Sequence, residues 1–433
     1  MPLQVILVAL AVLATAGIVA VIGAHASARR VRFAGRLATL ACALGAAGAV
    51  PALTGGTTWD LHLTGFMSCE SMRLELDALG AFFLLPLFII GGAGIHAQSG
   101  YWRQAELKTY GPLCTFFWAG AVGGMALLIL ARHTVFFLLG WEFMALSSFF
   151  LIRTETAQAE ARWAAWVYLV TTHAGTLCLF AMFALLRGAT GTFDFVALDE
   201  AQVGLGRLTA IFALALAGFG LKAGLMPLHF WLPPAHASAP CHVSALLSGI
   251  MIKMGIYGLV RIMGLLPEPP LAWGGVLLTA GGVSGVLGVA FAIGQHDLKR
   301  LLAYHSVENI GIIVMGIGLA MAGRSLGRPE LVLLGLSGGL LHVWNHGLFK
   351  SLLFLGAGAV VHATHTREID RLGGLAPRMP RTAGLFLLGS AAICGLPPLN
   401  GFVSELFLYM GLFRTVGTGT DTVWTGAAAG VPV

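Results

Sequence analysis

Residues 212–231 read FALALAGFGLKAGLMPLHFW, an apolar run that contains one lysine, Lys222, five residues before a proline. A charged side chain at the centre of a bilayer costs about 2.5–3.5 kcal/mol on insertion scales. Pro227 cannot continue a regular helix, because it lacks the amide N–H and its ring clashes with the preceding turn. The run therefore predicts a membrane protein with a functional ionisable group inside the membrane.

The composition is that of a polytopic all-α membrane protein. Of the 433 residues, 57% are hydrophobic and 10% are charged, against about 25% charged in soluble domains. The net charge of +6 does not indicate nucleic-acid binding, because the arginines gather at the ends of apolar stretches.

The sequence predicts no cofactor and no metal site. The six cysteines are scattered singly, without a CxxC or CxxH pair, which argues against iron–sulfur clusters, haem and structural zinc. No GxGxxG follows a strand-like run, so nucleotide binding has no support. We expect no catalytic residues and no bond chemistry in this chain, and any redox chemistry to lie in a partner.

Twelve apolar stretches are long enough to cross about 30 Å of hydrocarbon. They are 3–24, 36–54, 79–98, 112–131, 134–152, 163–186, 208–226, 242–264, 272–294, 299–322, 330–362 and 383–413. The first is too long and continuous for a signal peptide, so we expect it to remain as a span. Residues 55–77 are polar and alternating, and predict a small hairpin outside the membrane.

Basic residues set the expected orientation. With the N-terminus outside, fourteen Lys and Arg residues fall on one side and eight on the other, and three lysines stay within spans: Lys222, Lys253 and Lys350. The positive-inside rule then places both termini in the periplasm.

Two of the stretches are interrupted by prolines. The first interruption contains four prolines: Pro227, Pro233, Pro234 and Pro240. In the second, Pro397 and Pro398 precede Glu405 in CGLPPLNGFVSELF (394–407). Irregular backbone at membrane depth is tolerated only where protein or a water-filled cavity satisfies it. Two interrupted helices, each carrying an ionisable residue, predict internal repeats with ion sites at the breaks.

A line of protonatable groups lies in LLHVWNHGLFKSLLF (340–354). His342, His346 and Lys350 are spaced four residues apart, so they share one helical face as neighbours about 6 Å apart. Histidine titrates near neutrality and lysine shifts its pKa readily on burial, so the line predicts a proton relay. Metal ligation by the two histidines is an alternative, although no carboxylate or cysteine completes a ligand shell nearby.

Other interpretations stay open for three of the charged residues. Lys222 and Lys253 lie deep within their spans, but each could extend its ammonium group toward the interface. Glu142, in FFLLGWEFMALSSFF (136–150), is a candidate for the proton path, but a purely structural ion pair would also explain it.

Several further residues are open to interpretation. His173 stands alone in its span and favours a hydrogen-bonded packing role. His305 and Glu308 are candidates for either relay or structure. His229 and His236 lie in the interrupted segment and would mark its water-facing end.

Seven motifs then carry a resemblance to a known family. They are LGWEFMALSS, GFGLKAGLMPLHFWLPPAHASAP, HVSALLSGIMIKMGIYG, HDLKRLLAYHSVENIGI, HGLFKSLLFL, REIDRLGGL and GLPPLNGFVSELF. In order, and over about residues 75–410, they resemble the antiporter-like, proton-translocating membrane subunits of respiratory complex I and the group 4 hydrogenases. The hydrogenase-4 and formate hydrogenlyase branch is the most similar.

The resemblance implies a fold of two inverted five-helix repeats, each with a broken helix. On this basis residues 1–111 form an N-terminal three-helix segment with the periplasmic hairpin, and 112–264 form the first repeat. The second repeat, 272–413, would hold four helices and look incomplete, and 414–433 would be a tail.

The resemblance also implies roles. Glu142 matches a glutamate that pairs with the lysine at Lys222, and Lys253 matches the next lysine. His346 and Lys350 match the central connecting residues, and Glu405 the terminal charge. With His342, these residues make up the predicted proton path.

The function implied is that of a proton-translocating membrane subunit of a redox-driven complex, of the hydrogenase-4/formate hydrogenlyase or NADH–quinone oxidoreductase type. Its partners would be other membrane subunits and a peripheral redox arm, in a bacterial or archaeal inner membrane. A component of a multisubunit sodium/proton antiporter is the alternative, and a scaffold that anchors a hydrogenase is a third.

Overall fold

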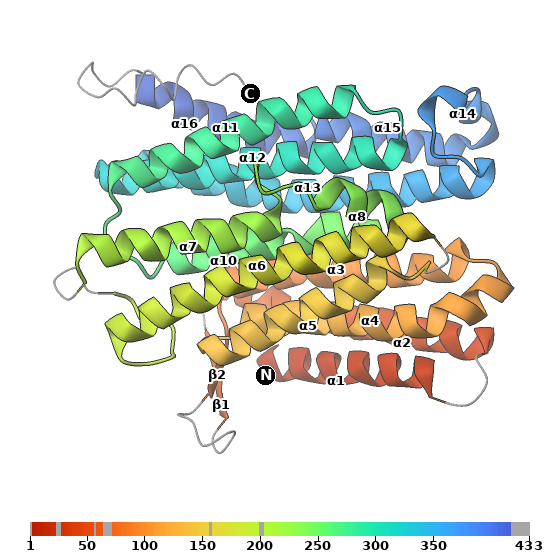
Figure 1. The fold of residues 1–433 in the computed structure, drawn as a ribbon, viewed down its shortest axis with the longest axis horizontal. Coiled ribbons are helices and arrows are strands. Elements are labelled where there is room, and N and C mark those ends of the chain that lie inside the picture. Colours follow the sequence, from red (N-terminus) through yellow and green to blue (C-terminus); the bar gives the residue numbers. More distant parts are fainter. Residues whose placement is uncertain are drawn as a thin grey trace.

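The computed structural model describes residues 2–22, 27–55, 58–63, 72–155, 158–198 and 203–416. Figure 1 shows helices lying side by side along a common direction, from α1 and α2 at one side of the molecule to α15 and α16 at the other. Within the described ranges the one sheet is the two-stranded β1–β2 hairpin. The all-α prediction is confirmed.

The first half of the chain contains α1 (Pro2–Val21), α2 (Ala28–Thr54), β1 (Trp59–Leu63), β2 (Met72–Leu76), α3 (Ala78–Tyr101), α4 (Gln104–Leu130), α5 (Thr134–Ile152), α6 (Ala159–Thr190) and α7 (Leu205–Ala223). There follow α8 (Leu232–Ser238), α9 (Cys241–Leu246), the π-helical turn η1 (Leu247–Met251), α10 (Lys253–Met263), α11 (Leu271–Ile293), α12 (Leu298–Ser325) and α13 (Pro329–Thr364). The last elements are the 3₁₀ turn η2 (Ile369–Arg371), α14 (Leu375–Arg378), α15 (Pro380–Ile393) and α16 (Asn400–Val416).

Eleven helical segments in the described residues are long and apolar enough to cross a membrane, with α9, η1 and α10 counted as one. They correspond to the first eleven predicted spans. The twelfth, 383–413, consists of the two shorter helices α15 and α16. The predicted break at Pro397 and Pro398 accounts for that division.

The other predicted break separates α7 from α8. Gly224 ends α7 with a φ of 78°, a left-handed conformation that glycine adopts without a Cβ penalty. Pro233 and Pro234 occupy the first turn of α8, where a missing N–H leaves no helical bond unmade. The backbone of residues 224–231 is therefore irregular beside Lys222, as the sequence predicts.

Strands β1 and β2 of the predicted hairpin 55–77 pair antiparallel, while residues 56–57 and 64–71 lie outside the described ranges. A charge cluster attaches β2 to the helices. Asp77 caps α3 by accepting a hydrogen bond from the Gly80 amide at 2.7 Å. Its carboxylate also lies 2.9 Å from Arg132 and 2.6 Å from Arg261. Burial alone would raise the pKa of Asp77, but the Arg261 hydrogen bonds and the charges of Arg132 and Arg261 outweigh it and lower the pKa to about 2.

Replacing Asp77 by asparagine is expected to lower the free energy of unfolding by about 2.5 kcal/mol at pH 7, the equivalent of the pKa difference. Because the folded pKa is depressed, the stabilisation is present above about pH 4 and is lost as the pH falls toward 2. Thermal unfolding in detergent, for both proteins between pH 7 and pH 2, measures this. Equal stability of the two proteins at pH 7 would contradict the expectation.

Helix α13 joins the two ends of the helix array. It contacts α3, α9, η1, α12, α15 and α16, and its 36 residues extend over about 54 Å at 1.5 Å per residue. Trp344 on α13 donates to the carbonyl of Phe82 on α3 at 2.8 Å. The line of histidines and Lys350 therefore lies between the early and the late helices.

Close approach of α7 and α10 depends on glycine. A Cβ at Gly255 on α10 would lie 2.4 Å from the carbonyl oxygen of Phe219 on α7, so the two backbones are in direct contact. Small residues allow helices in membranes to pack in this way. The contact brings Lys222 on α7 and Lys253 on α10 into neighbouring helices.

A chain of buried ionisable groups as the candidate functional site

The three lysines predicted within spans are fully buried. Lys222 is 1% exposed, and Lys253 and Lys350 are 0% exposed. Each ammonium donates to a neutral oxygen: the Tyr168 hydroxyl for Lys222 at 2.8 Å, the Ser248 carbonyl for Lys253, and the Leu302 carbonyl for Lys350. In the described part of the chain no carboxylate lies within 4.0 Å of these three nitrogens. The interpretation that Lys222 and Lys253 reach the interface is wrong.

The pairing of Glu142 with Lys222 that the resemblance implies stays a prediction, and in this structure the two side chains make no direct ion pair. The Glu142 carboxylate accepts from the Thr176 hydroxyl at 2.8 Å and lies 3.5 Å from His173 Nε2. Both partners belong to α6, which stands between α5 and α7. The charges of Glu142 and Lys222 interact only at longer range. His173 makes the predicted hydrogen bond, with Nδ1 2.9 Å from the Leu169 carbonyl, but it also contacts the glutamate.

The π-helical turn η1 places the acceptor for Lys253. The amide of Ile252 bonds to the carbonyl of Leu247 at 3.2 Å, five residues back, instead of to Ser248. The Ser248 carbonyl then accepts from the Lys253 ammonium. Single π-helical turns are frequent at functional sites, and here the turn gives a buried cation a backbone partner.

Two serines connect Lys253 with Lys350. The hydroxyls of Ser248 on η1 and Ser306 on α12 lie 2.8 Å apart, and both side chains are completely buried. Ser306 also donates at 3.1 Å to the Leu302 carbonyl, the same oxygen that accepts from Lys350. Ser248 therefore links α10 to α12, through its carbonyl to Lys253 and through its hydroxyl to Ser306, and the Leu302 carbonyl links α12 to α13.

The predicted histidine line is present on α13. The rings of His342 and His346 are 6.5 Å apart and both are fully buried. His342 Nε2 lies 3.0 Å from Asn309 Oδ1, and Nδ1 lies 2.9 Å from the Ser404 hydroxyl on α16. Because Asn309 donates its own NH₂ group to the His305 carbonyl at 2.8 Å, its Oδ1 faces His342, and Nε2 is the donor.

His346 has no hydrogen-bond partner among the described residues for either ring nitrogen. Its ring lies within electrostatic range of Lys253, Lys350 and His342. Buried polar groups are nearly always hydrogen-bonded to protein or to ordered water. His346 thus occupies a position where water is needed to complete its hydrogen bonds.

Glu308 links this line to Glu405. It lies 2.5 Å from His305 Nδ1 on the next turn of α12, and its charge interacts with both Lys350 and Glu405. The Glu405 carboxylate lies at the break between α15 and α16, where a Cβ at Gly395 would come within 2.5 Å of Oε2. Gly395 has a φ of 61°, a left-handed conformation that favours glycine.

Two histidines of the interrupted segment differ in their surroundings. His229 is half-buried, with its ring beside Phe291 and Tyr304, and it has no described hydrogen bond to the three buried lysines. His236 is fully buried, and neither ring nitrogen has a partner in the described chain. Lys253 and Lys350 lie within electrostatic range of it.

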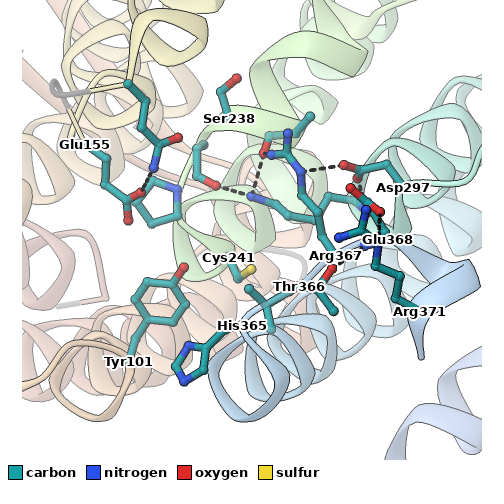
Figure 2. Close-up of a pocket in the computed structure, with 16 residues that line it drawn as sticks. Tyr101, Glu155, Ser238, Cys241, Asp297, His365, Thr366, Arg367, Glu368 and Arg371 are labelled. Carbon is teal, nitrogen blue, oxygen red and sulfur yellow. Dashed lines mark hydrogen bonds and ion pairs between the residues drawn. The ribbon is translucent and has the colours of Figure 1, made fainter. Parts of the chain in front are cut away.

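A polar cavity of about 540 Å³ lies where the ends of α3, α5, α8, α12 and α13 meet (Figure 2). Lys299 lines it, 4% exposed, with its ammonium bonded to the carbonyls of Ala237 and Ala239. Arg367 donates to the Ala237 carbonyl at 2.8 Å and lies 2.6 Å from Asp297. The cavity therefore reaches the residue that follows His236.

Two proteins of Escherichia coli (strain K12) are similar to this chain in sequence. Hydrogenase-4 component B of Escherichia coli (strain K12) is 41% identical over 345 residues, which are 79% of this chain and 51% of that protein. Formate hydrogenlyase subunit 3 of the same organism is 37% identical over 362 residues, 84% of this chain and 58% of that protein. The chain thus spans about half the length of these curated relatives.

Two solved structures have the same fold. The structure of the Mrp complex from Dietzia sp. DQ12-45-1b matches with a TM-score of 0.83 and 29% identity, covering 98% of this chain and 45% of that chain. The structure of the archaeal membrane-bound sulfane sulfur reductase matches with a TM-score of 0.82 at 21% identity, covering 99% and 84%. At 21% identity, the match to the sulfane sulfur reductase shows a shared fold only.

The family model described as NADH:quinone oxidoreductase/Mrp antiporter, TM, matches residues 131–419. That range contains every residue of the predicted proton path. The chain belongs to this family of membrane subunits.

Proposed function

We propose that the chain is a proton-translocating membrane subunit of a redox-driven complex, of the hydrogenase-4/formate hydrogenlyase or NADH–quinone oxidoreductase type. The observation that carries the proposal is the set of three fully buried lysines, each bonded to a neutral oxygen. An ammonium without a carboxylate partner can lose and regain a proton as the charges around it change.

The proton path follows the buried groups. A change of charge in a partner subunit alters the field at Glu142 and Lys222, and a proton moves on to Lys253. From there it moves by water past Ser248, Ser306 and His346 to Lys350, and Glu308 leads from Lys350 to Glu405. Each step is electrostatic and needs no large movement of a helix.

Proton entry fits the cavity at Lys299. The basic residues Lys299, Arg367 and Arg371 line it, and they belong to the more basic side of the chain, which the positive-inside rule places in the cytoplasm. In this orientation both ends of the chain face the periplasm. The division into two inverted repeats, 112–264 and 272–413, places the two broken helices in corresponding positions.

The proposed partners follow from the relatives that the chain resembles. The relatives named above are components of hydrogenase-4 and formate hydrogenlyase. By analogy we place this chain among other membrane subunits in the inner membrane, beside a peripheral redox arm that supplies the free energy.

A component of a multisubunit sodium/proton antiporter is the second candidate, because the Mrp complex structure matches nearly the whole chain. Transport measurements in everted vesicles that carry the assembled complex distinguish the two candidate functions. Proton uptake driven by formate or hydrogen oxidation in sodium-free buffer is expected from the first. A pH change that needs a sodium gradient and no reductant would establish the second and overturn the first.

Replacing Ser306 by alanine tests the link between the lysines. The change leaves the buried Ser248 hydroxyl without its partner, and a lost hydrogen bond of about 1–1.5 kcal/mol corresponds to a 5- to 10-fold lower rate of proton uptake. Redox-driven uptake in everted vesicles is the measurement. Ser351→Ala, which removes a buried hydroxyl bonded to the Ala245 carbonyl, is the matched control. Equal effects of the two changes would refute the link.

A further inference from the structure

We propose that Tyr168 is the positioning residue through which Glu142 acts on Lys222, with the hydroxyl-bearing face of α6 as the connection between the two charges. The inference rests on the proposed proton-translocating role of Lys222. In this inference the two charges communicate through α6, which stands between the carboxylate and the ammonium, and not through a direct ion pair.

Tyr168 holds the ammonium of Lys222. Among the described residues its hydroxyl is the only hydrogen-bond acceptor for Nζ, at 2.8 Å. The ammonium also lies 4.9 Å from the centre of the Tyr168 ring and 5.7 Å from the Trp141 ring, within range of cation–π attraction. The phenol is itself fixed, because it is fully buried and its ring packs edge-on at 5.2 Å against Trp231.

One face of α6 continues from this contact to Glu142. Tyr168, Thr172 and Thr176 are spaced four residues apart, so their side chains are neighbours on the helix. The Thr172 side chain interacts with the Tyr168 hydroxyl, which also lies 3.7 Å from Met251 Sδ. Thr176 donates to Glu142 at 2.8 Å and lies 3.1 Å from the Thr172 carbonyl. Buried contacts thus connect the carboxylate with the ammonium.

Hydroxyl groups suit this connection because each can donate and accept by rotating its hydrogen. An ionised Glu142 accepts from Thr176, whereas a protonated Glu142 can donate to it and turn the Thr176 hydrogen toward the Thr172 carbonyl. The reorientation thus reaches the Thr172 carbonyl, one helical turn from the tyrosine that holds Lys222. A phenol oxygen stabilises the ammonium without the permanent charge that would keep it protonated.

The titratable side chains around Lys222 are the other groups that could set the pH at which it gains or loses its proton. The titratable side chains carried by the neighbouring elements include Glu142 on α5, Tyr168, His173 and Cys178 on α6, His229 and His236 around α8, and Lys253, Tyr257 and Arg261 on α10. Of these, Tyr168 alone has a described hydrogen bond to the lysine.

Replacing Tyr168 by phenylalanine tests the proposal in the assembled complex. Phenylalanine keeps the ring packing and removes the oxygen, so the buried ammonium loses its acceptor. The alkaline limit of redox-driven proton uptake in everted vesicles is expected to move about one to two pH units lower, the equivalent of one hydrogen bond to a charged group. An unchanged pH profile would overturn the proposal.

Two further variants distinguish the proposed role of Tyr168 from other causes of a changed pH profile. Tyr257→Phe removes a buried tyrosine hydroxyl that donates to the Ile129 carbonyl, and it is expected to leave the pH profile unchanged. If Lys222→Ala abolishes uptake while Tyr168→Phe has no effect, the proposed function stands and the inference fails. If Lys222→Ala has no effect, the proposed function itself fails.

A double-mutant cycle tests the connection to Glu142. If Tyr168 mediates between the two charges, the effects of Glu142→Gln and Tyr168→Phe on the uptake rate will not multiply, because both interrupt the same series of contacts. Independent, multiplying effects would show that Glu142 reaches Lys222 by another route and would overturn the mediating role.

Discussion

Replacing Lys350 by methionine is expected to lower redox-driven proton uptake by at least about 100-fold, the lower range for removal of a positioned proton-transfer group. Lys350 is the point where the two serines, the histidine line and Glu308 converge. No other described side chain joins these three groups. Its loss therefore interrupts the path at its centre.

The same change is expected to leave the protein folded. Methionine has a similar length, and exchanging a buried charged group for an apolar one of similar volume is often neutral or stabilising. The Leu302 carbonyl keeps the hydrogen bond from Ser306, so no buried acceptor is left without a partner. Thermal unfolding in detergent and the yield of assembled complex measure this. Lys108→Met, on a lysine outside the membrane core, is the control for uptake, and uptake equal to that of Lys108→Met would contradict the central role of Lys350.

Lys222 is the second position with a large expected effect. Its ammonium is the first buried cation on the path, held by one phenol oxygen and two aromatic rings. Alanine removes the group that would receive the proton and leaves the irregular backbone of residues 224–231 in place. We expect proton uptake to fall by at least about 100-fold while electron transfer in the partner subunits continues.

The sequence alone predicts which side chains lie inside the membrane. Apolar length gives the spans, and prolines 227 and 397 mark the two breaks because proline cannot continue a helix. Spacing of four residues places His342 and His346 on one face, and the ring distance of 6.5 Å agrees. These features depend on local chemistry, which a single segment contains.

What the sequence does not predict is how neighbouring helices are rotated toward one another. Glu142 and Lys222 are both in apolar spans, but α6 turns its Tyr168 and Thr176 hydroxyls between them. The π-helical turn before Lys253, which lies against α3 and α13, is likewise invisible in the sequence. Buried Ser, Thr and Tyr at helical spacing are the signal that would have pointed to these residues.

The most direct measurement is the ratio of protons taken up to electrons transferred in everted vesicles that carry the whole complex, with the native chain and with Lys222→Ala. We predict that electron transfer persists in the variant and that proton uptake is lost, so the ratio falls toward zero. An unchanged ratio would contradict the account, because Lys222 would then be a structural residue and the chain a scaffold.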